Sequence, residues 1–282
     1  MTTDDDDKEP PTVQQPLSCK VHPQKPPSVT LTGPAIFLPS ATLLLSLRLL
    51  GPRPTELLVL LRNDYQNFLS LGPGGTPSSP HGYLQISWWR LWALGDPFTA
   101  PSPPSSSSSS ARGVLLPVSP SRTPDLPYRP GPRPLVAGIA PQRQLDQHGP
   151  RRSYLALRRA MLRLAAAKPL SFGTERSCVE KHGLALFARH ALRTNCQGEI
   201  VHVHDSDHSM HLCLHPADMD VVLRRGWGQR HPLARRGWLL RMPVSCDFVM
   251  IYAPRNEHEL QTVYRIIEAA IWYTSEAKVS LS

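Results

Sequence analysis

The sequence predicts an α+β protein whose packed part is a mainly antiparallel sheet covered by helices. Two observations predict this class. Of 31 prolines in the 282 residues, 27 precede residue 171, and proline interrupts helices and sheet interiors. The packed core is therefore expected in roughly the last hundred residues. There the strand-like and helix-like segments do not alternate strictly, which favours an antiparallel over a parallel sheet.

Composition divides the chain into four segments. Residues 1–33 are polar and proline-rich, so they are predicted to be disordered. Residues 34–98 carry apolar runs, and residues 99–132 contain PSPPSSSSSS, which is typical of a low-complexity Pro/Ser linker. Residues 133–282 are predicted to form the α+β domain.

The apolar run from Ala35 to Leu50 fits either a membrane anchor or a buried helix. It is shorter than the roughly 20 apolar residues that span a bilayer, and Pro39 lies near its start. A second apolar run covers residues 55–61, and WWRLW at 88–92 fits either an interfacial aromatic belt or a patch packed on the core. Membrane association through a single-pass anchor is expected, with the α+β domain on the cytoplasmic side.

The elements of the domain follow from periodicity and capping signals. Residues 153–168 predict a helix with one apolar face, formed by Leu157, Ala160, Met161, Leu164 and Ala165. Residues 183–192 fit a strand or a helix equally well. EIVHVHD and MHLCLH each predict a strand, and so does CDFVMIYAP.

Two later helices carry start and stop signals. Pro216 fits the first turn of a helix that ends before Gly226. Asn256 is predicted to cap the last helix, and Glu259 three residues later completes a pattern similar to a capping box. The apolar face of that helix is formed by Leu260, Val263, Ile267, Ala270 and Ile271.

Charge and cysteine content exclude some functions. The formal charge is +9, but the arginines form short clusters without the spacing of a nucleic-acid module, so no nucleic-acid partner is expected. The cysteines at 19, 178, 196, 213 and 246 are odd in number and form no CxxC motif. This indicates neither a disulfide framework nor a zinc ribbon, and it predicts a reducing environment. Cys213 is expected to be a small buried hydrophobic residue.

Five of the twelve histidines lie in EIVHVHDSDHSMHLCLH, residues 199–215. Side chains alternate along a strand, so Ile200, His202 and His204 share one face, while His211, Cys213 and His215 share a face of the second strand. A hairpin that turns at Ser206–Asp207 pairs His202 with His211 and Val203 with Met210. One face of this hairpin is therefore apolar and the other carries imidazoles.

Three explanations fit this imidazole face. His202, His204 and His211 could bind a metal together with Asp205 or Asp207. They could instead act as general acid and base, because the imidazole pKa lies near neutrality. The face could also be a polar surface exposed to water. The spacing alone leaves all three open.

The strings GWGQRHPLA and YAPRNE, together with the histidine hairpin, resemble the luciferase-like domain family. RNDYQNFLSLGPGGTP resembles the family's N-terminal portion, so the resemblance covers about 55–98 and 133–278. His208 departs from a small turn residue in many relatives, although histidine tolerates positive φ better than branched residues do. The Pro/Ser stretch lies outside the resemblance.

The resemblance implies a luciferase-like enzyme that acts on a phenolic, pyrone or polyketide-type small molecule in fungal secondary metabolism. The implied reaction is either an oxygenation, which would make it an oxidoreductase, or a related acid–base step such as isomerisation or cyclisation. Molecular oxygen would be the co-substrate, with no other cofactor and no metal. The implied site residues are proton-handling His202, His204 and His211, with Asp207 orienting an imidazole. Arg230 and His231 would stabilise oxyanion charge, and Trp227 and Tyr252 would wall the substrate site.

Each assignment has a structural alternative. Trp227 could fill the core, Arg230 could bind carbonyls of its own loop, and Tyr252 could be an ordinary strand residue. The function also has alternatives, which are a metal-dependent enzyme that uses the same histidines and a non-catalytic membrane-tethered module. The sequence makes no prediction of the oligomeric state.

Overall fold

The computed structural model describes residues 54–102, 113–115, 126–193, 196–237 and 240–281. Six strands form one sheet in the order β3-β4-β5-β6-β8-β7, and all neighbouring strands pair antiparallel. These strands are β3 (Phe172–Arg176), β4 (Leu184–Ala188), β5 (Glu199–Val203), β6 (Met210–Cys213), β7 (Gly228–Arg230) and β8 (Phe248–Ile251). A separate two-stranded ladder joins β1 (Val136–Gly138) and β2 (Gln142–Gln144). The predicted α+β class with a mainly antiparallel sheet is confirmed.

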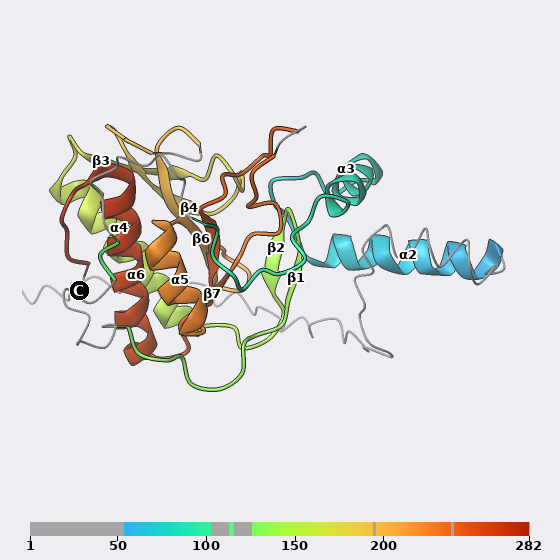
Figure 1. Ribbon diagram of the computed structural model, residues 1–282, viewed down its shortest axis with the longest axis horizontal. Helices are drawn as coiled ribbons and strands as arrows, with labels where there is room; N and C mark the ends of the chain where they lie inside the picture. The colour runs from blue at the N-terminus through green and yellow to red at the C-terminus, as the bar shows by residue number, and fades with distance from the viewer. Residues whose placement is uncertain (1–53, 103–112, 116–125, 194–195, 238–239, 282) are drawn as a thin grey trace, which may run out of the picture. The chain divides into compact units, whose positions relative to one another are not determined.

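Three helices pack against the sheet and against one another (Figure 1). They are α4 (Arg151–Ala167), α5 (Pro216–Arg224) and α6 (Glu257–Ser275). Their apolar faces and the apolar side chains of β4, β5, β6 and β8 form the main core. A second core joins Phe248 and Cys213 of the sheet to side chains of α2 (Pro54–Ser70) and α3 (Pro80–Arg90), such as Phe68 and Ile86.

The predicted helix ends are confirmed. The Asn256 side chain accepts a hydrogen bond from the Glu259 N–H at 2.9 Å, as an N-cap should. Glu259 does not complete a capping box, because its carboxylate binds the backbone N–H and the guanidinium of Arg255 instead. Pro216 opens α5, and Gly226 ends it with a φ of 82°, which glycine adopts without a Cβ clash.

Residues 183–192, for which periodicity allowed a strand or a helix, contain strand β4. Ala185 and Leu186 are both fully buried, so neighbouring residues on both faces of this strand are covered. A strand buried on both faces loses the alternation that identifies it in sequence. The short strands β1, β2, β3 and β7 were not predicted at all, and β7 begins in the glycine-rich stretch that was expected to be a loop.

A β-bulge in β5 changes which side chains face the histidines. β4 and β5 shift register between Leu186 and Phe187, so that Leu186 pairs with Val201 and Phe187 pairs with Glu199. Ile200 is the extra residue at this bulge and joins the main core beside Val201. The prediction that Ile200 shares the imidazole face is therefore wrong. Glu199 takes that place instead.

The predicted apolar anchor lies mostly outside the described residues, since Ala35–Leu50 falls there. The second apolar run lies in α2, where Leu58, Val59 and Leu60 are 66%, 56% and 48% exposed. A buried core helix is therefore wrong for the first turns of α2. In the part of the chain that the structure describes, no helix is both long and apolar enough to cross a membrane. Residues 1–33, which are predicted to be disordered, also lie outside the described residues. So does most of the Pro/Ser linker.

The cysteine prediction needs a correction, because Cys178 and Cys196 form a disulfide. Cys178 follows β3 and Cys196 precedes β5, and the antiparallel strands β3, β4 and β5 bring these two loops to the same end of the sheet. Spacing alone does not reveal such a pair, because the residues are 18 positions apart. The expected reducing environment rested on the absence of a disulfide and no longer follows. Cys213 is a buried free cysteine, as predicted.

Candidate functional site

The histidine hairpin has the predicted register. His202 pairs with His211, and Val203 pairs with Met210. His208 lies in the turn with a φ of 63°, which the sequence had left in doubt. His202, His204 and His211 are 1%, 2% and 3% exposed. The explanation of a polar face open to water is therefore wrong, and the imidazoles lie inside the protein.

The three imidazoles meet through their ring nitrogens. His211 Nδ1 lies 3.0 Å from His204 Nε2 and 3.3 Å from His202 Nε2. One ring nitrogen of each residue lies within 4.8 Å of those of the other two. We call these three residues the histidine cluster.

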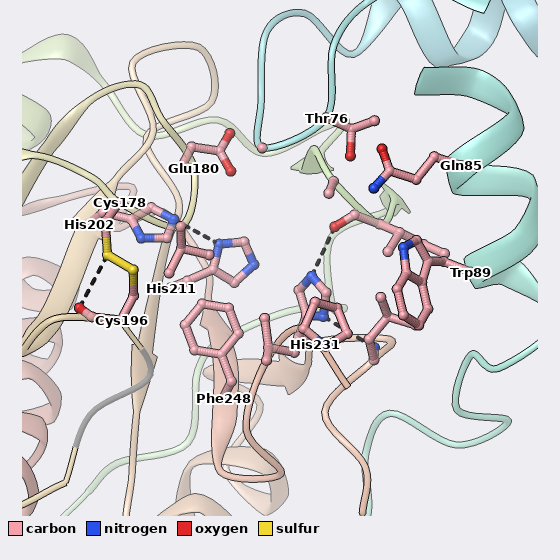
Figure 2. Close-up of a pocket in the computed structure, with 17 residues that line it drawn as sticks. Thr76, Gln85, Trp89, Cys178, Glu180, Cys196, His202, His211, His231 and Phe248 are labelled. Atoms are coloured by element: carbon pink, nitrogen blue, oxygen red, sulfur yellow. Dashed lines mark hydrogen bonds between the residues drawn. A yellow bond between two sulfur atoms is a disulfide. The ribbon is translucent and has the colours of Figure 1, made fainter. Parts of the chain in front are cut away.

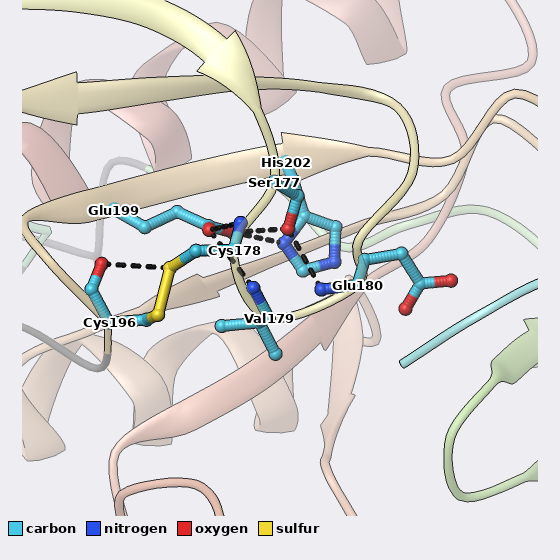
Figure 3. Close-up of a disulfide and its surroundings, with 7 residues drawn as sticks. All are labelled: Ser177, Cys178, Val179, Glu180, Cys196, Glu199 and His202. Atoms are coloured by element: carbon cyan, nitrogen blue, oxygen red, sulfur yellow. Dashed lines mark hydrogen bonds and ion pairs between the residues drawn. A yellow bond between two sulfur atoms is a disulfide. The ribbon is translucent and has the colours of Figure 1, made fainter. Parts of the chain in front are cut away.

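Glu199 binds His202 on the ring nitrogen that faces away from the other two histidines. Its carboxylate lies 2.6 Å from His202 Nδ1 and also accepts hydrogen bonds from Ser177 Oγ, at 2.9 Å, and the Cys178 N–H, at 2.7 Å (Figure 3). Burial works to raise the Glu199 pKa, but the hydrogen bonds and the nearby imidazole outweigh it, so the pKa lies below its ordinary value. An ionised Glu199 accepts a hydrogen bond from the His202 Nδ1–H, and Nε2, on the opposite side of the ring, faces His211 Nδ1.

Asp207, which the resemblance implies to orient an imidazole, contacts His204 in a similar way. Asp207 Oδ1 lies 3.2 Å from His204 Nδ1, and the Ser209 hydroxyl lies between the two side chains. Burial raises the Asp207 pKa, but His204 and the Gln144 N–H outweigh it, and the pKa lies far below its ordinary value. Burial and the charge of Arg143 lower the pKa of His204. The pair is therefore a neutral imidazole bound to a carboxylate.

His211 completes the cluster at its centre. Its Nε2 lies 2.8 Å from Oε1 of Gln142, a residue of β2 that precedes His211 by 69 positions in the chain. Burial lowers the pKa of His211 well below its ordinary value, and the neighbouring His204 and His202 add to this effect. His211 is therefore neutral at pH 7.

His231 lies next to the cluster but has no free nitrogen. Its Nε2 donates to the Ile139 carbonyl at 2.9 Å, and its Nδ1 accepts from the Leu233 N–H at 3.1 Å. Its ring lies edge-on to His211, with centroids 5.6 Å apart. Burial lowers its pKa to about 4. A neutral imidazole with both nitrogens engaged lines the site without supplying a charge.

A cavity of about 260 Å³ opens beside the cluster. His202 and His211 lie on one side of it, and Trp89 and Gln85 of α3 lie across from them (Figure 2). Glu180 and Thr76 supply polar groups, and the remaining wall is mostly apolar, with Ile139, Val179, Leu233, Val244 and Phe248. His204 does not line this cavity and lies behind His211. The site thus combines a mostly apolar cavity with a few converging polar groups.

Three predicted residues lie elsewhere. Arg230 donates to the carbonyls of Thr99 and Ala234. Trp227 is buried in the main core and donates to the Pro127 carbonyl at 2.6 Å. Tyr252 is also fully buried, and its hydroxyl donates to Gln229. None of the three lines the cavity, and the structural alternatives describe their contacts.

Sequence reasoning missed Glu199, Gln142 and Trp89. Glu199 follows from the bulge, and the only sequence signal for it is the adjacent apolar pair Ile200–Val201, which breaks strict alternation. Gln142 belongs to a three-residue strand with no signal of its own. Trp89 lies in the WWRLW run, which suggested a membrane interface or a core patch. Asp205, considered as a metal ligand, is exposed and binds Tyr154 of α4 instead.

The buried His231 predicts a loss of stability in mild acid. Its folded pKa of about 4 lies below the unfolded value of about 6.5, so the unfolded state binds more protons between these values. The stability is complete above about pH 6.5 and falls as the pH drops toward 4. The loss between pH 7 and pH 5 should be about 2 kcal/mol from this residue alone. Glu180 works against this shift, whereas His202 and His204 add to it.

Urea unfolding at pH 7 and pH 5 checks this expectation in the full-length protein. His231→Gln has no imidazole to protonate, so its free energy of unfolding should fall less over this pH range. An equal fall in both proteins would contradict the assignment of a neutral buried His231.

The fold and the cavity define the class of protein. The protein has an α+β domain in which a cavity of about 260 Å³ ends on buried imidazoles, one of them, His202, held by a carboxylate. A family model described as Luciferase domain matches residues 197–270, which include the whole histidine hairpin. No solved structure matches the chain.

Fungal luciferases are similar over most of the chain. The luciferase of Armillaria mellea is 34% identical over 233 residues, which cover 76% of this chain and 81% of that protein. The luciferase of Armillaria gallica is 33% identical with the same coverage. The luciferase of Neonothopanus nambi is 31% identical over 236 residues, again covering 76% and 81%. The chain belongs to the luciferase domain family, and the resemblance found in the sequence is confirmed.

Proposed function

We propose that the protein oxygenates an electron-rich hydroxylated small molecule of phenolic, pyrone or polyketide type with molecular oxygen. The observation that carries the proposal is the cavity that ends on His202 and His211 in a chain of the luciferase family (Figure 2). Light emission is not part of the proposal.

The cavity walls suit a flat, hydroxylated substrate. Trp89 and Phe248 offer aromatic faces, and aromatic pairs gain about 0.5–1.5 kcal/mol beyond simple burial. Glu180, Gln85 and Thr76 offer polar groups for substrate hydroxyls. A cavity built mostly of apolar walls also keeps water away from a reactive peroxide.

The chemistry begins with removal of an acidic proton from the substrate. His202 Nε2 is the proposed acceptor, because Glu199 binds Nδ1 and stabilises the imidazolium that forms. The electron-rich carbon of the resulting enolate then forms a bond to molecular oxygen, which is reduced to the peroxide level. The proton held on His202 returns to the terminal oxygen and gives a hydroperoxide, so substrate and oxygen are the only reactants. His211 is placed to pass the proton between His202 and His204.

Removal of the Trp89 side chain tests where the substrate binds. Trp89→Ala should raise KM for a hydroxylated pyrone about tenfold, because the lost ring contact is worth about 1.5 kcal/mol. Oxygen consumption and hydroperoxide formation by the purified full-length protein measure the turnover.

Trp88→Ala is the matched control. Trp88 lies on the same helix, is 50% exposed and does not line the cavity, so its removal should leave KM unchanged. Equal effects of the two substitutions would rule out this cavity as the substrate site. Absence of oxygen consumption by the wild-type protein with hydroxylated pyrones and phenols would refute the proposed reaction.

A further inference from the structure

The hydrogen-bond partners of the histidine cluster fix the ring tautomers. Glu199 is a carboxylate and only accepts, so His202 carries its proton on Nδ1. The Ser209 hydroxyl donates to Asp207, so it accepts from Nδ1 of His204. In both residues Nε2 therefore bears a lone pair that points away from the carboxylate.

His211 presents a third lone pair to the same point. Its Nε2 donates to the side-chain oxygen of Gln142, which leaves Nδ1 as the acceptor nitrogen. That Nδ1 faces both His204 Nε2 and His202 Nε2. The three ring nitrogens that these outer partners leave unengaged therefore converge on one point between the rings.

Two of the three nitrogen–nitrogen distances are close to those around a metal ion. Nitrogens that bind one tetrahedral ion at about 2.0–2.1 Å lie about 3.3–3.4 Å apart. The measured separations of 3.0 and 3.3 Å are close to this, and all three nitrogens fall within 4.8 Å. Each imidazole is also held by a second group (Glu199, Asp207 or Gln142), as is usual for histidines that bind metals.

We infer that His202, His204 and His211 form a binding site for one divalent transition-metal ion. Three imidazoles suit Zn²⁺, Co²⁺ and other ions of similar softness, whereas Mg²⁺ and Ca²⁺ prefer oxygen ligands. His202 and His211 line the cavity, so a fourth coordination position faces the space where a small molecule binds. Three protein ligands with one open position are typical of an accessible rather than a closed structural site.

Metal binding also regulates the same site, a consequence that rests on the proposed function. The ion uses the His202 lone pair that would accept the substrate proton. Zn²⁺ has no redox chemistry of its own, so zinc-loaded protein should turn over more slowly than metal-free protein.

A cobalt titration of chelator-treated full-length protein tests the binding. One equivalent of Co²⁺ should give the intense visible absorption of a four-coordinate ion, and X-ray absorption should show three imidazole nitrogens at about 2.0–2.1 Å. Absence of the near-ultraviolet bands of cobalt–thiolate bonds would separate this site from any site at a cysteine, including Cys213 and Cys246, which are free in the described part of the chain. His204→Ala should lower the Co²⁺ affinity more than about 100-fold, and Glu199→Gln about 10- to 100-fold.

His258→Ala is the matched control, because His258 is exposed at the start of α6 and should bind Co²⁺ no differently from the wild type. No stoichiometric binding by the wild type would overturn the inference. X-ray absorption that shows fewer than three imidazole ligands would also overturn it. This measurement uses the wild-type protein, so it does not depend on whether a variant folds. Unchanged binding in a folded His204→Ala protein would overturn it as well.

Turnover separates this inference from the proposed function. Slower turnover on zinc loading supports both the site and the role of His202 as proton acceptor. Faster turnover, with one equivalent of metal bound, would retain the site but overturn the regulation and the proton transfer to His202.

Discussion

Replacement of Glu199 by alanine is expected to lower the free energy of unfolding by about 3–5 kcal/mol and to remove most turnover. The carboxylate is 4% exposed and accepts hydrogen bonds from His202, Ser177 and Cys178 (Figure 3). Alanine leaves these buried donors without an acceptor, and each costs about 1–3 kcal/mol. His202 would also lose the group that fixes its tautomer. Urea unfolding at pH 7 measures the stability, and oxygen consumption per folded molecule measures the turnover.

Glu175→Ala provides the control for this expectation. Glu175 lies on β3 but is exposed, so its removal should change the stability by no more than about 0.5 kcal/mol. Glu199→Gln should cause an intermediate loss of stability. Its amide keeps one acceptor oxygen, but its NH2 group is a donor and faces a group that also donates. A loss below about 1 kcal/mol for Glu199→Ala would mean that the carboxylate does not hold the loop and the imidazole together.

The histidine hairpin could be predicted in register because two local rules agree there. Side-chain alternation sorts the residues of each strand onto two faces, and the turn residues fix how the strands meet. The pairing of His202 with His211 followed from these rules alone. The expected role of Asp207 came from the family resemblance instead, and the structure places its carboxylate 3.2 Å from His204 Nδ1.

Glu199 could not be predicted, because the bulge that turns it is set by a neighbouring strand. The register shift occurs between β4 and β5, and β4 itself could not be distinguished from a helix in sequence. Strict side-chain alternation would place Glu199 on the same face as Val201 and Val203. One extra residue at Ile200 reverses this placement and supplies the carboxylate that holds His202.

The cavity could not be predicted for a different reason. Its walls come from α3, from the loop after β1 and from the loop that carries His231, which tertiary packing alone brings together. Trp227 and Tyr252 were reasonable wall residues by type, but an aromatic side chain fills a core as well as it lines a site. The order of the strands, which places Cys178 beside Cys196, was equally invisible in the sequence.

Substitution of His202 by alanine is expected to lower kcat about 100- to 10,000-fold, the range that a general base contributes. His202 is the imidazole that both lines the cavity and is held by a carboxylate. His211 also lines the cavity, but its second nitrogen binds the neutral Gln142, which stabilises an imidazolium less than a carboxylate does. His202→Asn should lose as much activity with less disturbance of packing, because it keeps a polar side chain near Glu199.

The central claim is that oxygenation takes place at the histidine cluster, and one comparison tests it most directly. Oxygen consumption by His202→Ala and His258→Ala is measured on a hydroxylated pyrone, with each rate divided by the folded fraction from circular dichroism. The account predicts at least about a 100-fold loss for His202→Ala and no change for the exposed His258→Ala. Wild-type turnover by a folded His202→Ala protein would contradict it.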